Sequence, residues 1–254
     1  MRLDIYLKEN KNIKSRARAK LLIESDKVTV NGLVHKNCSY NVKDGDTITV
    51  EDMLYVSRAG YKLKYAAEYL QSSKDSTPIT LDFTNKKCLD IGSSTGGFTD
   101  FLLQNGADLV CSVDVGSEQF DISLIEKYQH KIKLFENTDI RNVDEIEYFK
   151  NKKSEGGFDI IVCDVAFISL THIVPSIQKY MKEGGFGLIL FKPQFEVGRE
   201  NNKSGIVKDQ SISLKFLDEM IEKFSLAGIK VIKHFKSGVV GGDGNTEYML
   251  YITK

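Results

Sequence analysis

The fold class follows from one segment, Leu89-Asp90-Ile91-Gly92-Ser93-Ser94-Thr95-Gly96-Gly97-Phe98-Thr99-Asp100. It reads as an apolar strand, a glycine-rich turn and the first residues of a helix. Glycine at such a turn lets a ligand approach the backbone closely. The spacing differs from the GxGxxG pattern of dinucleotide-binding turns, because Ser94 stands in place of the middle glycine. The segment therefore predicts an α/β fold with a ligand turn of a looser kind.

Strand-like apolar runs and helical spacing alternate through residues 86–254. The apolar runs cover residues 88–91, 109–113, 158–163, 187–191, 229–232 and 248–252. Runs of this kind suit strands that are buried on both faces of a parallel sheet. Between them, Leu214, Leu217, Ile221 and Phe224 recur at helical spacing. The pattern predicts an α/β domain with a Rossmann-like, doubly wound sheet over residues 86–254.

Residues 1–55 differ in character and predict a small α+β domain. Two short helical stripes come first, and residues 27–32 then read as a strand that enters an Asn31-Gly32 turn. A further alternating strand ends near Val50. Between the two domains we expect a connecting segment, residues 56–85, with a helix over residues 59–70 and a polar loop. The predicted domains are thus 1–55 and 86–254, joined by 56–85.

Charge is balanced over the whole chain but not locally. Thirty-five basic and 35 acidic residues give a formal net charge of zero, so overall charge predicts no polyanionic partner. Residues 8–20 are strongly basic, and their cations can contact phosphates because screening limits each charge to about 8–10 Å. We predict contacts with phosphates, such as those of a nucleic acid, at Lys14, Arg16, Arg18 and Lys20. The alternative is a solvated helix face.

Cysteine usage and hydropathy argue against a disulfide-rich, a secreted and a membrane-spanning protein. The four cysteines lie far apart and form no CxxC pair, which argues against a disulfide framework and against a structural zinc site. We predict no metal site. The N-terminus lacks the unbroken apolar stretch of a signal peptide. No apolar run approaches the roughly 20 residues that span a bilayer. We therefore expect a cytoplasmic protein that makes no membrane contact.

A carboxylate at the end of the next strand completes a nucleoside site. Asp114 follows the apolar run 109–113, about 24 residues after Asp90. A carboxylate there can accept hydrogen bonds from both ribose hydroxyls. Either feature alone can be a plain turn or cap, but together they favour a nucleoside cofactor, and S-adenosylmethionine is one such ligand that fits the looser turn. The predicted cofactor-binding residues are Asp90, Gly92, Ser93, Ser94, Thr95, Gly96, Gly97, Phe98 and Asp114.

Two further polar residues directly follow strand-like runs. Asp164 comes after the run 158–163, and Lys192 comes after the run 187–191. Doubly wound folds place their sites at the carboxyl ends of strands, so both side chains are candidates for chemistry. A lysine in this position must reach solvent or find an acid. A structural ion pair between the two residues is the alternative.

Five motifs together resemble a known family. They are Ser57-Arg58-Ala59-Gly60-Tyr61-Lys62-Leu63, the turn Asp90 to Phe98, Cys163-Asp164-Val165, Lys192-Pro193-Gln194-Phe195-Glu196 and Gly244-Asn245-Thr246-Glu247. In these motifs the chain resembles the TlyA-type proteins, historically labelled haemolysins, whose larger domain is similar to FtsJ-type ribose methyltransferases. Residues 1–55 resemble an S-four-type RNA-binding domain in Arg2-Leu3-Asp4, Ser15-Arg16 and Val28-Thr29-Val30-Asn31-Gly32. The resemblance covers nearly the whole chain.

The resemblance implies an activity and a catalytic set. It implies a catalytic tetrad of Lys62, Asp164, Lys192 and Glu247, in which Lys192 helps to deprotonate a ribose 2′-hydroxyl. The implied reaction is S-adenosylmethionine-dependent methylation of a cytidine in large-subunit ribosomal RNA, either free or in an assembled subunit. Shorter family members resemble the type that acts on the large subunit alone. The oligomeric state stays open.

The chain departs from the family pattern after Asp114. The family often shows a glycine-glutamine segment there, whereas this chain reads Gly116-Ser117-Glu118-Gln119-Phe120. Asp139 is a further candidate for contacts with the adenine of the cofactor.

Two other functions remain as alternatives. A membrane-active haemolysin would need an apolar helix or an amphipathic barrel, and liposome leakage would reveal it. A non-catalytic RNA-binding protein with a relic methyltransferase fold would bind the cofactor without turnover.

Overall fold

The computed structural model describes residues 1–11, 13, 15–72, 77–198, 202, 205–239 and 244–254. The chain divides into two compact units, Met1–Arg58 and Ala59–Lys254. The helix predicted over residues 59–70 spans Arg58–Ser72 and lies mostly in the second unit. Part of the predicted loop after it, residues 73–76, lies outside the described residues.

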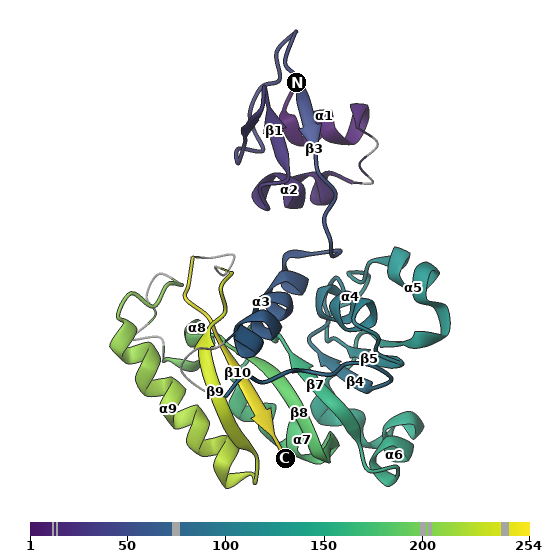
Figure 1. Cartoon of the computed structure of the whole chain (residues 1–254), viewed down its shortest axis with the longest axis vertical. Coiled ribbons are helices and arrows are strands. Elements are labelled where there is room, and N and C mark those ends of the chain that lie inside the picture. The colour runs from purple at the N-terminus through teal and green to yellow at the C-terminus, as the bar shows by residue number, and fades with distance from the viewer. Residues whose placement is uncertain (12, 14, 73–76, 199–201, 203–204, 240–243) are drawn as a thin grey trace. The chain divides into compact units, whose positions relative to one another are not determined.

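The first unit consists of two helices and a small antiparallel sheet (Figure 1). Its elements are α1 (Leu3–Asn10), α2 (Arg16–Glu24), β1 (Val28–Val30), β2 (Leu33–Val34) and β3 (Ile48–Val50), with strand order β2-β1-β3. The predicted Asn-Gly turn is present between β1 and β2, where Asn31 and Gly32 have φ of 51° and 80°. Two positive φ values in sequence define the turn that matches the twist of a tight hairpin. The helices pack on the sheet through a core of Leu3, Leu7, Ala19, Leu22, Ile23, Val28, Val30 and Ile48.

The second unit is a mixed sheet covered by helices on both faces. Its strands are β4 (Lys87–Ile91), β5 (Leu109–Val113), β6 (Ile132–Phe135), β7 (Phe158–Cys163), β8 (Met181–Phe191), β9 (Lys230–Lys236) and β10 (Tyr248–Thr253). Its α-helices are α3 (Arg58–Ser72), α4 (Gly97–Gln104), α5 (Ile122–Tyr128), α6 (Glu147–Ser154), α7 (Val174–Tyr180), α8 (Pro193–Glu196) and α9 (Gln210–Leu226). Short 3₁₀ helices are η1 (Gln129–Lys131), η2 (Ile140–Glu145) and η3 (Leu170–His172).

The strand order of this sheet is β6-β5-β4-β7-β8-β10-β9. β4 to β8 are parallel. The buried apolar runs predict strands at β4, β5, β7 and β8, whereas β6 is not among the predicted strands. β10 runs antiparallel to both β8 and β9 and lies between them, which the sequence analysis does not foresee. Because β10 is inserted next to β8, the residues that precede it reach the edge of the sheet where the parallel strands end.

Alternation along the strands assigns the helices to two faces. Leu89 and Ile91 of β4 belong to a core with residues of α6, α7 and α9. Asp90 points to the other face, where it accepts a hydrogen bond from Thr99 of α4. α3 lies on this second face as well, with Tyr69 stacked on Phe235 of β9.

Candidate active site

The glycine turn joins β4 to α4 and requires an unusual backbone. Gly92, Ser94 and Gly96 have φ of 79°, 45° and 85°, in the left-handed region that favours glycine. A Cβ on Gly92 would lie 2.9 Å from the carbonyl oxygen of Asp164, so glycine lets the ends of β4 and β7 meet. Ser94 takes the same kind of conformation with a side chain present, and its N–H donates to Asp114.

A cavity of about 530 Å³ opens beside this turn. That volume is within the range of cavities that hold nucleoside-sized ligands. Its wall consists of the ends of β4 and β5 and the segments that follow β4, β5, β6 and β7. The lining residues are Ile91, Gly92, Ser94, Val113, Asp114, Val115, Gly116, Gln119, Thr138, Asp139, Ile140, Arg141, Asp164, Val165, Ala166, Phe167, Ile168 and Ile173.

Asp114 accepts hydrogen bonds from two segments of the cavity wall, the glycine turn and the segment after β5. Its Oδ2 accepts a hydrogen bond from the N–H of Ser94, and its Oδ1 accepts one from the N–H of Gly116, both at 2.7 Å. Each carboxylate oxygen has a second lone pair, so hydrogen bonds from ribose hydroxyls remain possible. Gln119 lies against Gly116 and accepts a hydrogen bond from the Ser94 hydroxyl at 3.2 Å.

Asp139 lies on the same cavity wall and is held by Arg141. The Arg141 guanidinium donates from Nε to Asp139 Oδ1 at 2.9 Å and from Nη2 to Oδ2 at 2.5 Å. These hydrogen bonds are the largest cause of the lowered pKa of Asp139. The carboxylate is therefore ionised and fixed in direction, which suits an acceptor for an amino group of the ligand.

Two buried polar atoms at the glycine turn test whether S-adenosylmethionine fits. Asp90 Oδ1 and the Ser93 hydroxyl are buried and have no hydrogen-bond partner among the described residues. Burial raises the pKa of Asp90 to about 7, against the effect of the hydrogen bond from Thr99. A buried acceptor without a partner is costly, and a cationic donor next to the turn would relieve that cost. The amino acid end of S-adenosylmethionine carries such a cation, so the residues present fit this cofactor.

The predicted cofactor residues thus fall into two groups. Gly92, Ser94, Asp114 and Asp139 line the cavity. The remaining residues build the turn behind it or, in the case of Phe98, pack into the core: Asp90, Ser93, Thr95, Gly96, Gly97 and Phe98.

The structure brings the predicted tetrad together at the edge of the cavity. Asp164 and Lys192 follow the neighbouring parallel strands β7 and β8, and Lys192 Nζ lies 2.5 Å from Asp164 Oδ1. Lys62 of α3 lies 3.4 Å from Asp164 Oδ2 and 2.8 Å from Glu247 Oε2. Asp164 itself lines the cavity. Side chains far apart in the sequence therefore form one chain of alternating charges.

Glu247 reaches the tetrad because it directly precedes β10. Its carbonyl oxygen accepts a hydrogen bond from the N–H of Ser237. Two residues earlier, the buried side chain of Asn245 accepts from the N–H of Val207 at 2.9 Å and donates to the carbonyl of Gly205 at 2.8 Å. These bonds fix the segment that carries Glu247.

The tetrad is buried and electrically neutral. Its side chains are between 4% and 13% exposed. Burial acts to raise the pKa of Asp164, but the two lysines outweigh it and the pKa is lowered. Burial likewise acts to lower the pKa of Lys62, but Asp164 and Glu247 outweigh it and the pKa is raised. Lys62, Asp164 and Glu247 therefore form a fixed charged frame around Lys192.

Among the lining residues that sequence reasoning misses are Arg141, Gln119 and Phe167. Arg141 follows Asp139 by two residues, a spacing that allows a local ion pair. Gln119 lies in the segment that departs from the family pattern. Phe167 follows Asp164 by three residues, and its side chain is 93% exposed. An apolar residue so close to a strand-end carboxylate is the signal that could have identified it.

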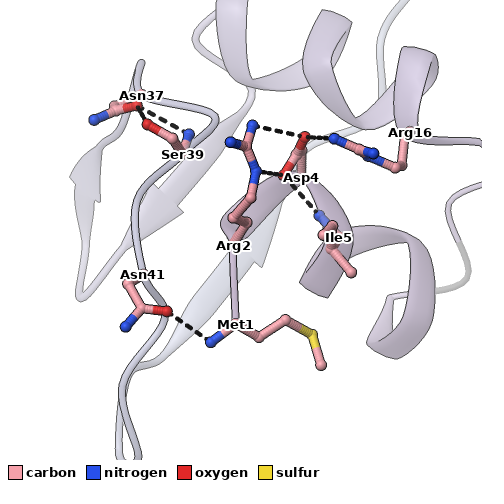
Figure 2. Close-up of polar contacts among 8 residues, drawn as sticks. All are labelled: Met1, Arg2, Asp4, Ile5, Arg16, Asn37, Ser39 and Asn41. Carbon is pink, nitrogen blue, oxygen red and sulfur yellow. Dashed lines mark hydrogen bonds and ion pairs between the residues drawn. The ribbon is translucent and has the colours of Figure 1, made fainter.

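The predicted RNA-binding residues of the first unit differ in what they contact. Figure 2 shows Asp4 between the guanidinium groups of Arg2 and Arg16. Arg18 donates to the backbone carbonyl of Val56, and Lys20 lies 3.6 Å from Glu24. Lys14 lies outside the described residues. Of the described predicted residues, Arg16 combines an exposed guanidinium with a second arginine beside it.

The fold and the cavity define a class of protein. A mixed sheet with β10 antiparallel beside β8, a glycine turn after β4 and a carboxylate after β5 form the site of a nucleoside-dependent transferase. The FtsJ-like methyltransferase family matches residues 55–254, and the S4 domain matches residues 1–48. The chain belongs to the FtsJ-like methyltransferase family. The predicted fold class and family are confirmed, and the chain is an S-adenosylmethionine-dependent methyltransferase.

Several proteins are similar to this chain over nearly its full length. The "23S rRNA (cytidine-2'-O)-methyltransferase TlyA" of Campylobacter jejuni is 36% identical, and the match covers all of both chains. The "16S/23S rRNA (cytidine-2'-O)-methyltransferase TlyA" of Mycobacterium tuberculosis is 30% identical over 99% of this chain and 89% of its own. A solved structure described as a putative hemolysin from Streptococcus thermophilus is 32% identical, with a TM-score of 0.73, and covers 100% of this chain and 88% of its own.

Membrane spans and metal sites remain to be considered. In the part of the chain that the structure describes, no helix has the length and apolar character needed to cross a bilayer. Within those same residues, no group of three or more His, Cys, Asp and Glu side chains is arranged to hold a metal ion.

Proposed function

We propose that this chain transfers the methyl group of S-adenosylmethionine to the ribose 2′-hydroxyl of a cytidine in 23S ribosomal RNA. The observation that carries the proposal is the buried tetrad of Lys62, Asp164, Lys192 and Glu247 at the edge of the cofactor cavity. The relative with the higher identity is named for 23S RNA alone, which favours the large subunit as target.

The residues supply positioning and a proton acceptor. When bound, S-adenosylmethionine supplies a methyl group on a sulfonium, and the reaction forms an O–C bond as the S–C bond breaks. Lys192 first releases its own proton to solvent; its neutral amine then accepts the proton of the 2′-hydroxyl, and Asp164 stabilises the ammonium that results. Lys62 and Glu247 hold Asp164 in place from the other side. A positioned base of this kind contributes about 10²–10⁴-fold to a rate.

Phe167 is the contact for the base of the target nucleotide. This residue is 93% exposed and lies three residues after Asp164, on the segment that lines the cavity. RNA enzymes and RNA-binding proteins stack unpaired bases on aromatic side chains, at about 1–3 kcal/mol per base. An exposed phenylalanine beside the tetrad therefore favours a nucleotide that is unstacked from its RNA.

The first unit is the docking module for the RNA. Arg2 and Arg16 share one carboxylate, Asp4, so the cluster keeps a surplus positive charge. Its half-exposed guanidinium groups suit the phosphates of RNA, which they contact with paired N–H donors. The partner is ribosomal RNA in the free state or in an assembled subunit, and the reaction takes place in the cytoplasm, where ribosomes are assembled.

Methyl incorporation tests this proposal. The purified chain is incubated with labelled cofactor and either free 23S RNA, 16S RNA or assembled subunits, and the label is mapped to one nucleotide. The expected result is a single 2′-O-methylcytidine in 23S RNA. Label in protein, in a base or in no RNA at all contradicts the proposal. Leakage of liposomes at equal protein concentration would instead support the haemolysin alternative.

A further inference from the structure

Two segments of the second unit run side by side along the substrate edge of the site. The first, residues 164–170, follows β7 and carries Asp164 and Phe167. The second, residues 192–196, follows β8 and carries Lys192 and ends at Glu196. Three contacts join them in matching order along the two segments. They are the ion pair of Lys192 with Asp164, the ring contact of Phe195 with Phe167 at 5.3 Å, and two hydrogen bonds to Glu196.

Glu196 uses both carboxylate oxygens in the last of these contacts. The Ser169 hydroxyl donates to Oε2 at 2.6 Å, and the N–H of Leu170 donates to Oε1 at 2.8 Å. Ser169 in turn caps η3 by accepting from the N–H of Thr171. The carboxylate therefore sets the direction of the backbone at the point where the segment of Phe167 enters η3.

The segment needs such a fixed end because of Phe167. This residue has φ of 64°, a conformation that is strained for a bulky side chain and persists only where the surroundings impose it. The near end of the segment is fixed by the sheet, since the N–H of Asp164 donates to the carbonyl of Ile91. The far end has the Glu196 carboxylate, whereas the exposed ring of Phe167 is held only by its contact with Phe195 among the described aromatic residues.

We propose that Glu196 is a positioning residue for the RNA substrate: it acts through Ser169 and Leu170 to hold Phe167 in its strained, exposed conformation. The inference rests on the proposed function, because it concerns the same site. It assigns Glu196 to substrate affinity and leaves proton transfer to Lys192. Asp164 and Lys192 are fixed by β7, β8 and their own ion pair, so loss of Glu196 leaves them in place.

A substitution of Glu196 is expected to change the affinity for RNA without unfolding the protein. Burial raises the pKa of Glu196, against the effect of the hydrogen bonds from Ser169 and Leu170. Partial burial of the carboxylate therefore disfavours its charged form, and a neutral glutamine is expected to be tolerated. A glutamine amide can still accept from the N–H of Leu170, and it can donate to the Ser169 hydroxyl. Leu170 remains anchored by its buried side chain.

The test is steady-state methylation of 23S RNA by the full chain and its variants. Glu196→Ala is expected to raise KM for RNA about tenfold, within the value of one base stack, while kcat stays within about threefold. Glu196→Gln is expected to recover KM to within about twofold of the wild type. Glu183→Ala, a glutamate 82% exposed on β8, serves as the matched control.

A double-mutant cycle separates positioning from a general structural role. Phe167→Ala raises KM on its own, and Glu196→Ala is expected to add little to it, because no ring remains to be held. Additive effects of the two substitutions, or an unchanged KM in Glu196→Ala, would overturn the inference. If Glu196→Ala does not fold, Ser169→Ala replaces it in the same cycle with the same criteria. A wild-type chain that methylates no RNA overturns the proposed function first, and a methylating chain with unchanged KM in Glu196→Ala overturns this inference alone.

Discussion

Each unit of the molecule contains a cluster of ion pairs, and the two clusters are built in opposite ways. Around Asp4 in the first unit, the side chains of Arg2 and Arg16 are 48% and 57% exposed. Around Asp164 in the second unit, the side chains of Lys62 and Lys192 are 11% and 12% exposed. The first cluster has two cations to one anion, whereas the tetrad is balanced because Glu247 supplies a second anion.

The difference relates charge balance to function. The open cluster keeps a surplus of positive charge in contact with solvent, where a phosphate can reach it. The buried cluster has no surplus, since an uncompensated charge in its surroundings would be costly. Burial also fixes the side chains, which is what a proton acceptor for an aligned hydroxyl requires. In the proposed function, Asp4 therefore presents two arginines to RNA, and Asp164 holds the proton acceptor Lys192 in place.

The largest effect is expected from removal of the base. Lys192→Ala should lower kcat for methylation by about 10²–10⁴-fold, because no other group accepts the hydroxyl proton. RNA affinity should stay near the wild-type value, since the arginines of the first unit are untouched. Lys150→Ala, which removes a lysine paired with Glu145 on the surface, is the control. A loss of RNA binding in step with kcat would contradict the division of roles.

A smaller effect is expected on stability when the buried frame is broken. Lys62→Met should lower the free energy of unfolding by about 3–5 kcal/mol, because it leaves Glu247 buried without its cation. Lys64→Met removes an exposed lysine paired with Glu68 on the same helix and should cost only about 0.3–0.5 kcal/mol. Urea denaturation measures both. Adding Glu247→Gln to Lys62→Met should restore part of the loss, and failure to do so would mean that the charge of Glu247 is not the cause.

The acids of the two units should also respond to pH with opposite signs. Arg2 holds the pKa of Asp4 below its ordinary value, so its contribution to stability is present above pH 3.8 and is lost as the pH falls further. Burial raises the pKa of Asp90 from 3.8 to about 7, so the folded state binds the extra proton and stability falls as the pH rises from about 4 to 7.

Paired denaturation curves measure this contrast. The unfolding free energy of Asp90→Asn, relative to the wild type, should increase between pH 4 and 7 and then stay constant. That of Asp4→Asn should approach the wild type only below pH 4. If the two variants depended on pH in the same way, the arginines around Asp4 and the burial of Asp90 would not be what determines the ionisation of these acids.

The sequence predicts the parts of the site that follow from the parallel sheet. Asp164 and Lys192 each end an apolar run, and neighbouring parallel strands end at the same edge, so their meeting could be expected. Lys62 and Glu247 could not be placed in this way. Lys62 comes from a helix outside the sheet, and Glu247 depends on β10 being inserted antiparallel beside β8. Only the resemblance to a family supplied those two residues.

Side-chain contacts between segments distant in the sequence could not be predicted from the sequence either. Glu196 acts on Phe167 through a hydrogen bond to Leu170, which lies 26 residues away in the sequence. No local sequence pattern encodes a contact over that distance. In the first unit, the sequence groups Arg16 and Arg18 into one basic run. The structure separates them, because Arg16 joins Asp4 whereas Arg18 donates to the Val56 carbonyl. Spacing in a short helix is too coarse to distinguish an exposed cation from one that holds the backbone.

The smallest effect tests this separation. Arg16→Ala should weaken RNA binding and lower the slope of log affinity against log salt by about one unit, since it removes one phosphate contact. Arg18→Ala should leave that slope unchanged, because its guanidinium is engaged by a backbone carbonyl and any loss of affinity comes through the local structure. Binding of 23S RNA fragments at several salt concentrations measures both slopes. If the two variants lower the slope equally, the basic run acts as one surface, and the cluster around Asp4 has no special role in docking RNA.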